Sequence, residues 1–383
     1  MLKKYRTAFT SGLFMLLALV LAACGGGTNN APAGTTPQHT YKYVTPPHKG
    51  GTLVYSDWQF PESVNPLFAA SVVDTKVQDA IWGGLVVISS DSQYLPDQLT
   101  EVPSLQNGDI SKDSLTVTLK IRHDLKWSDG QPLTSADYIY MLKLVNDPAT
   151  GAATTAGLDP STLASYTAPD PYTIVLKYVQ PFSSFLAFLP VALPQHAWGS
   201  IPDSALQTTQ KVNVTPDVTS GPFKIQDYAS SQSYTMVPNT YYVSSTLHPT
   251  VLDKLVFKGF ATKDALIAGF QAGEADQSEN FTAADLQKLR GVPGLLVTPK
   301  IETEHLDFNQ QNPVLQDVHV RQAIAQAIDR CQIIQSLLQE KCSDGLTESV
   351  VPAPSPFFDP TIKGYPFSLS AAKADMQAAG WDC

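Results

Sequence analysis

Histidines, cysteines and paired carboxylates are the residues of this chain that could do chemistry directly. The seven histidines are scattered, and neither a His-x-x-x-His nor a Cys-x-x-Cys spacing that could hold zinc occurs. The sequence also lacks the Gly-x-Ser-x-Gly, His-Glu-x-x-His and phosphate-loop patterns of hydrolases and nucleotide enzymes. Glu302 and Glu304 form a carboxylate pair, but acidic residues are common here and usually face solvent. We therefore expect a binding protein with no catalytic residues, no metal and no cofactor.

Cys24 is the cysteine with the most informative surroundings. It follows Leu21-Ala22-Ala23 at the end of an apolar run from Leu13, after a basic start. A charged start, a short apolar core and small residues describe a secretory signal peptide that is too short to span a membrane. Leu-Ala-Ala-Cys resembles the bacterial lipobox, in which the cysteine receives lipid and becomes the first mature residue. The alternative is an ordinary signal peptide, which the following glycines and polar tail disfavour.

The three other cysteines allow at most one disulfide within the chain, because their number is odd once Cys24 carries lipid. Cys331 and Cys342 would lie about 16 Å apart on a straight helix, too far to bridge. Their pairing requires the chain to turn back after Leu338. The sequence leaves open which pair forms among Cys331, Cys342 and Cys383.

The composition excludes one class of partner. The chain has 383 residues, of which 43% are hydrophobic, enough for a large core and more than one domain. Without residues 1–23 the balance is 22 Lys+Arg against 35 Asp+Glu, a net charge of −13. Such a surface does not neutralise phosphates, so we expect no nucleic-acid binding.

The elements that must position a binding site mix strands and helices. Residues 25–50 contain little that could form a core and are interpreted as a tether. Alternating apolar residues predict strands at residues 52–55, 115–121, 172–178 and 253–260. Caps and apolar spacing predict helices that follow Thr134 and Thr282, the second stopping at Gly291, and helices at residues 263–271, 318–340 and 370–379. This mixture, without a strict β-α-β order, predicts an α/β or mixed α+β fold with more than one lobe.

Five blocks of sequence resemble one family. In chain order they are Leu119–Asp137, Thr219–Ile225 with Asn239–Tyr242, Ala272–Asp276, Phe308–Asn309 with Asp317–Arg330, and Ala372–Trp381. Blocks of this kind in this order, after a lipobox, resemble the extracytoplasmic solute-binding proteins of peptide-type ABC importers, the oligopeptide, dipeptide and nickel class.

The resemblance implies a two-lobed periplasmic-binding-protein fold with a subdomain inserted in the first lobe. The expected parts are a signal peptide (1–23), a lipidated cysteine and tether (24–50), lobe I (51–82 and 178–258), the inserted subdomain (83–177) and lobe II (259–383). Members of the family continue past the block at Ala372–Trp381. We therefore expect lobe II to be incomplete in this sequence, as in a C-terminally truncated member.

The resemblance also implies positions that line the cleft between the lobes. They are Trp58, Ala70, Ser71, Val72, Glu279, Asn280, His305 and Asp307. His305 and Asp307 are expected on one face of a strand, and Asp307 or Glu279 could attract a cationic group. The alternative for the charged residues is a surface or salt-bridged role, and for Trp58 burial beneath the first strand. Asp329 and Arg330 are expected to hold their helix against its neighbours.

The expected function is capture of peptides, or a related small solute, for an ABC permease and its ATPase subunits. We expect a monomer on the extracytoplasmic face of the membrane, periplasmic or on the cell surface, anchored by lipid on Cys24. A nickel or metal-chelate solute is a variant of this hypothesis. The alternatives are a surface sensor or adhesion lipoprotein that uses the same fold without transport, and, last, a surface hydrolase.

Overall fold

The structure is a computed structural model that describes residues 49–89, 93–153, 156–243, 250–298, 303–338, 341–351 and 358–382. The predicted signal peptide, Cys24, nearly all of the tether and Cys383 lie outside these residues. Across the described ranges, every helix is too short or too polar to cross a membrane.

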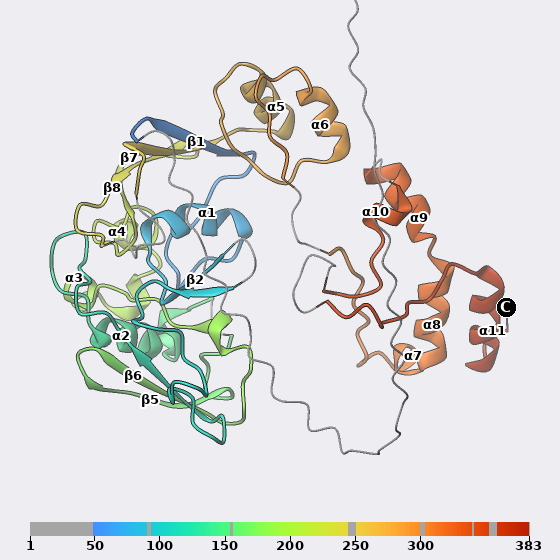
Figure 1. The fold of residues 1–383 in the computed structure, drawn as a ribbon, viewed down its shortest axis with the longest axis horizontal. Helices are drawn as coiled ribbons and strands as arrows, with labels where there is room; N and C mark the ends of the chain where they lie inside the picture. The colour runs from blue at the N-terminus through green and yellow to red at the C-terminus, as the bar shows by residue number, and fades with distance from the viewer. Residues whose placement is uncertain are drawn as a thin grey trace, which may run out of the picture. The chain divides into compact units, whose positions relative to one another are not determined.

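A four-stranded sheet in the order β1-β9-β8-β7 brings the first strand of the described chain beside strands from residues 223–259 (Figure 1). Strand β1 (Thr52–Asp57) runs parallel to β9 (Lys254–Gly259), whereas the other pairs are antiparallel. Strand β8 (Ser233–Pro238) pairs with β9 inside the sheet, and β7 (Phe223–Ala229) pairs with β8 and forms the edge opposite β1. The strands predicted at residues 52–55 and 253–260 are therefore confirmed.

Helix α1 (Val72–Ile81) packs on the β7 side of this sheet. Ser71 and Asp74 form a capping box, in which each side chain bonds the backbone N–H of the other residue. Val77 and Ile81, on the inner face of this helix, are completely buried and belong to the main hydrophobic core. The apolar face of α1 thus fixes the helix against the sheet, while its other face stays open to solvent.

A three-stranded antiparallel sheet in the order β4-β6-β5 lies between residues 116 and 178. Its strands are β4 (Thr116–Lys120), β6 (Thr173–Tyr178) and β5 (Leu163–Asp170). Val117 and Leu119 are buried and their neighbours are not, as the predicted alternation requires. Helix α2 (Ser135–Val145) lies beside this sheet in Figure 1 and begins at the predicted cap, Thr134. Here the N–H of Thr134 donates to Asp137 Oδ2 at 2.9 Å.

Short strands and helices connect these two sheets and pack around them. They are β2 (Val86–Ile88), β3 (Tyr94–Pro96), η1 (Pro148–Thr150), η2 (Phe185–Phe188), α3 (Gln195–Trp198), η3 (Asp203–Ala205) and α4 (Gln210–Asn213). Trp82, Trp127 and Trp198 pack edge to face between them, with ring centroids 5.7 to 6.4 Å apart. One continuous hydrophobic core therefore extends over both sheets.

Helices α5 (Lys263–Gln271) and α6 (Ala283–Leu289) form a smaller pair with its own core around Leu266 and Leu289. Helix α5 has the predicted bounds. Helix α6 is capped by Thr282 as predicted, but it ends two residues before Gly291. Lys288 Nζ pairs with Asp264 Oδ1 at 2.8 Å across the two helices.

The single long helix predicted from Val318 to Glu340 is wrong. Helix α8 (Val318–Ala327) ends because Ile328 takes an extended conformation (φ −93°, ψ 116°). Asp329 then caps a new helix, α9 (Arg330–Ile333), by accepting a hydrogen bond from the N–H of Gln332 at 2.9 Å. A π-helical turn, η4 (Ile334–Leu338), continues from α9. The apolar spacing runs through the break, so periodicity alone could not reveal it.

The remaining helices are α7 (Pro313–Gln316), α10 (Cys342–Gly345) and α11 (Leu369–Ala378). Helix α11 begins after Ser368 and ends before Gly380, one residue from the predicted bounds. It packs against α8, where the Asp375 carboxylate accepts from Gln326 Nε2 at 2.9 Å and contacts His319 Nδ1 at 3.0 Å.

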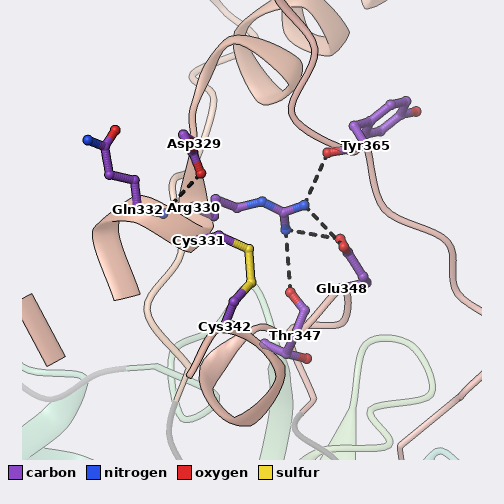
Figure 2. The surroundings of a disulfide bond; sticks show 8 residues. All are labelled: Asp329, Arg330, Cys331, Gln332, Cys342, Thr347, Glu348 and Tyr365. Atoms are coloured by element: carbon purple, nitrogen blue, oxygen red, sulfur yellow. Dashed lines mark hydrogen bonds and ion pairs between the residues drawn. A yellow bond between two sulfur atoms is a disulfide. The ribbon is translucent and has the colours of Figure 1, made fainter. Parts of the chain in front are cut away.

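Cys331 and Cys342 form a disulfide, which settles the pairing that the sequence left open (Figure 2). Their Cα atoms are 4.9 Å apart, because the chain turns back after Leu338 and α10 begins at Cys342. Next to this bond, the Arg330 guanidinium pairs with Glu348 and donates to the backbone carbonyls of Thr347 and Tyr365. Asp329 and Arg330 therefore hold neighbouring segments in place, as expected.

Replacement of Cys342 by serine removes this cross-link. We expect the free energy of unfolding of the segment around α9 and α10 to fall by about 2–4 kcal/mol, because the unfolded chain gains the entropy of an open loop. Thermal unfolding followed by circular dichroism, with and without dithiothreitol, measures the change.

The reductant should bring the wild-type transition to that of Cys342→Ser and leave the variant where it was. Cys383→Ser is the matched control, because it removes a thiol and leaves the bridge intact. Identical unfolding of wild type and Cys342→Ser without reductant would show that the bond contributes nothing.

Candidate functional site: a pocket between helix α1 and the sheet

A pocket of about 290 Å³ lies between α1 and the four-stranded sheet. This volume is at the lower end of the range for small-molecule sites, about 300–1,000 Å³. Apolar side chains form most of its wall, and a few polar groups stand at one side. The lining residues are Leu53, Tyr55, Lys76, Asp79, Ala80, Pro222, Phe223, Met236, Leu255, Phe257 and Gln277.

The register of the sheet assembles the apolar floor. In the parallel pair, Leu53 lies opposite Leu255 and Tyr55 lies opposite Phe257. Because side chains alternate along a strand, these four point to the same face. Met236 pairs with Leu255 from the other side and extends that face into β8. The rings of Tyr55 and Phe257 stack with centroids 5.9 Å apart. The floor is therefore made of side chains from three adjacent, hydrogen-bonded strands.

Glu279 lies at one side of the pocket, where it bonds to two of the residues that line it. The Tyr55 hydroxyl donates to Glu279 Oε1 at 2.6 Å, and the Lys76 ammonium forms an ion pair with the same carboxylate. Residues 276–277 run beside β1, where the N–H of Ser56 donates to the carbonyl of Gln277 at 2.8 Å. Burial, and then the charges of Asp57 and Asp79, raise the pKa of Tyr55 well above its ordinary value. The hydroxyl therefore remains a hydrogen-bond donor at neutral pH.

Asp79 is the second carboxylate of the pocket, three residues after Lys76 on the same helix. Loss of hydration raises the pKa of Asp79, and the charge of Lys76 only partly opposes this effect. Within the described ranges, Asp79 has neither a hydrogen bond nor an ion pair. Its side chain is nevertheless open to solvent. A ligand that enters the pocket would therefore meet a carboxylate that is near the charge of Lys76 but has no direct hydrogen bond or ion pair in the described structure.

In the segment Ala70 to Val72, two backbone N–H groups are already hydrogen-bonded within the protein. The N–H groups of Ala70 and Ser71 both donate to Asp74 Oδ2 at 3.0 Å, as part of the cap of α1. The Val72 side chain is 65% exposed at the start of the helix. Trp58 follows β1 and is 41% exposed, so it is not buried beneath the strand. Whether these residues contact a ligand stays a prediction.

The other predicted positions lie outside the lining of the pocket. Asn280 has a positive φ of 64°, and its carbonyl accepts from Lys263 Nζ at 3.0 Å. His305 and Asp307 do not belong to a strand, so this part of the prediction is wrong; the segment forms no ladder with another strand in the described structure. Their side chains still lie together, with His305 Nε2 3.3 Å from Asp307 Oδ2. Both are largely exposed, and their role in binding stays a prediction.

The sequence prediction missed Tyr55, Lys76 and Asp79. A signal for the last two was present, because charged residues at positions i and i+3 of an amphipathic helix share one face. No sequence pattern indicated that this face would lie over an apolar floor, since the floor comes from strands about 200 residues apart. Within the described residues, His, Cys, Asp and Glu form no group that could hold a metal ion.

Comparison with known proteins identifies the family. The model of bacterial extracellular solute-binding proteins, family 5 (middle), matches residues 93–382. A Brucella ovis protein named as an ABC transporter peptide-binding protein is 33% identical over 285 residues, which are 72% of this chain and 51% of the relative. The chain belongs to family 5 of the bacterial extracellular solute-binding proteins. Members of this family are extracytoplasmic proteins that bind solutes.

A more distant relative of this family 5 member agrees with that assignment. The periplasmic murein peptide-binding protein MppA of Escherichia coli is 27% identical over 352 residues, 84% of this chain and 61% of the relative. The chain spans about half the length of the Brucella relative. The similarity to MppA extends over more of the chain than the family model does.

Solved structures share the fold. The oligopeptide-binding protein AppA of Bacillus subtilis, in complex with a nonapeptide, superposes with a TM-score of 0.70 at 21% identity, covering 88% of this chain and 66% of that one. DppA of Helicobacter pylori, in complex with the peptide STSA, gives a TM-score of 0.68 at 20% identity, covering 87% and 67%. The predicted mixed α/β fold of two-lobed periplasmic binding proteins is therefore confirmed.

The raised pKa of Tyr55 predicts a specific response of this family 5 member to alkaline pH. In the unfolded chain a tyrosine loses its proton near pH 10, before Tyr55 does so in the folded chain. The neutral hydroxyl therefore contributes stability below pH 10 that is lost as the pH rises further. We expect Tyr55→Phe to lose about 1 kcal/mol at pH 7, where the bond to Glu279 is removed, and to decline less steeply between pH 10 and 11.

Urea unfolding at pH 7, 10 and 11 measures both effects. Tyr241→Phe is the matched control, because the Tyr241 side chain is 42% exposed. Parallel pH profiles for wild type and Tyr55→Phe would contradict the assignment of the shift to Tyr55.

Proposed function

We propose that this protein is the substrate-binding component of an ABC importer that captures peptides outside the membrane. The observation that carries the proposal is the 33% identity to a relative named as a peptide-binding protein, within a family of solute-binding proteins. The pocket at α1 supports a binding role, because it combines an apolar wall with a small number of polar groups.

The physical chemistry of such a receptor explains why the chain needs no catalytic group. A receptor for many related peptides can bind their backbone amides and charged ends while leaving space for variable side chains. We propose that lobe I comprises residues 51–82 and 178–258, with residues 83–177 inserted, and that lobe II begins at residue 259. Ligand contacts with both lobes would shift the population from open to closed by a hinge motion. Trp58, Ala70 to Val72, Glu279, Asn280, His305 and Asp307 are the proposed contacts.

We also propose that the mature protein is anchored by lipid on Cys24 and reaches its solute as a monomer. The partners in this proposal are a membrane permease and its ATPase subunits. Residues 25–50 would act as a tether, with a root-mean-square span of roughly 25–30 Å for a flexible coil. A single acyl chain binds a membrane only weakly, so more than one chain on Cys24 is part of the proposal.

Peptide capture predicts stabilisation by ligand. We expect di- to pentapeptides to raise the unfolding temperature of the full chain, since a ligand at about 100 times its dissociation constant adds about 2.7 kcal/mol to the folded state. Differential scanning fluorimetry with a peptide panel measures the shift. Free amino acids and a nickel–histidine chelate test the related solutes.

A shift with the chelate alone would replace peptide with metal chelate as the solute. A panel without any shift would contradict peptide capture by this chain and favour another solute or the sensor or adhesion role.

Lipid anchoring predicts a change of cell fraction. Cys24→Ser, expressed in a bacterial host, should move the protein from the membrane fraction to the soluble fraction, because the thiol that forms the thioether to lipid is missing. Metabolic labelling with palmitate, followed by fractionation, measures this change. Cys383→Ser is the control that keeps Cys24 and should retain both label and membrane association. Labelled Cys24→Ser protein in the membrane fraction would contradict the assignment.

A further inference from the structure

We propose that the pocket between α1 and the sheet binds an apolar group that carries an ammonium, with Asp79 as the residue that pairs with the cation. This inference rests on the proposed function where it concerns peptides, and it names the ligand class of one pocket. The corresponding ligand in a peptide is an amino-terminal residue with an aliphatic or aromatic side chain.

The floor of the pocket sets the apolar part of the ligand. Leu53 pairs with Leu255 across the parallel strands, and Phe257 lies two residues beyond Leu255 on the same face. Met236, opposite Leu255 on β8, extends this surface. Volume restricts the ligand to a small body, because about 290 Å³ accommodates one large side chain and its backbone atoms rather than a longer peptide. Burial of such a side chain against this floor is favourable because it removes apolar surface from water.

The charges at the pocket set the polar part. Lys76 and Glu279 form an ion pair, and the Tyr55 hydroxyl donates to the same glutamate. These three groups are therefore satisfied by one another. Gln277 is neutral, and its backbone carbonyl accepts from the N–H of Ser56 at 2.8 Å. Asp79 contributes one further negative charge, so Lys76, Asp79 and the adjoining Glu279 together carry a charge of −1, which favours a cation.

The surroundings of Asp79 make it the specific partner of that cation. It lines the pocket together with Ala80, whose side chain is buried in the core, so the carboxylate adjoins the apolar wall. Partial loss of hydration without a compensating partner is unfavourable for a carboxylate, and a bound ammonium would reverse this effect. The raised pKa of Asp79 reports the same loss of hydration. The attraction of a cation, which the sequence assigned to Glu279 or Asp307, thus passes to a residue that the sequence did not single out.

Two matched pairs of ligands test the inference on the full chain. Leucinamide carries an ammonium and an isobutyl side chain, whereas N-acetyl-leucinamide keeps the side chain and has no charge. Leu-Ala-Ala and its N-acetyl form are the corresponding peptides. Isothermal titration calorimetry at pH 7 compares wild type with Asp79→Asn. Asp227→Asn is the control, because Asp227 is an exposed carboxylate on β7 of the same sheet and does not line the pocket.

We expect acetylation to weaken leucinamide binding to the wild type by at least about tenfold. Asp79→Asn should weaken leucinamide binding by a similar factor and should no longer distinguish the two amides, whereas Asp227→Asn should behave as wild type. Circular dichroism confirms that each variant is folded. Ala80→Met, which fills the pocket from its wall, should weaken both amides together.

Wild type that binds the two amides equally, or binds neither, would overturn the inference. The same holds if Asp79→Asn distinguishes the amides as well as wild type does. If the amides behave as expected and peptides do not bind, the pocket inference stands and peptide capture fails. If Leu-Ala-Ala binds equally to wild type and Asp79→Asn, peptide capture stands and the pocket inference fails.

Discussion

The parallel pairing of β1 with β9 brings together two segments that lie about 200 residues apart in the chain. Much of the described structure around the pocket depends on it. The pairing places Leu53 beside Leu255 and Tyr55 beside Phe257, which makes the floor of the pocket. It also leaves the other edge of β1 available to residues 276–277, where Asp276 Oδ2 accepts from the N–H of Val54 at 2.8 Å. A parallel pair of distant strands forms slowly and has little local support, so the bonds at both edges of β1 matter.

The two carboxylates at the pocket differ because of their partners. Glu279 is held by Lys76 and Tyr55, and an ion pair of this kind mainly fixes geometry, since the cost of removing two charges from water offsets much of their attraction. Asp79 has the charge of Lys76 nearby but forms neither a hydrogen bond nor an ion pair in the described part of the chain. Lys76 thus pairs with Glu279, which it holds in place, and lies near Asp79, which remains available to a ligand.

The part of the chain that follows α6 is organised by local bonds. Asp329 starts a new helix after a break, Arg330 connects three other positions, and the disulfide closes the turn between α9 and α10 (Figure 2). The cap of Asp329 and the disulfide join residues that are close in sequence, so they form with little loss of chain entropy, whereas Arg330 also reaches Tyr365 farther along the chain. Helix α11 then adds one longer contact to α8 through Asp375.

The sequence by itself determined the family, the mixed α/β fold class and the positions of four strands and four helices, because alternation, helix caps and short motifs are local and survive without knowledge of distant partners. Thr134 and Thr282 act as caps for this reason. The tertiary structure alone decided where the apolar faces meet. Tyr55, Lys76 and Asp79 come together only because β1 pairs with β9, so the sequence did not reveal them as a group. It also decided the break at Ile328 and the pairing of Cys331 with Cys342. Apolar periodicity continues through a break in the backbone, and cysteine spacing does not reveal whether the chain turns back.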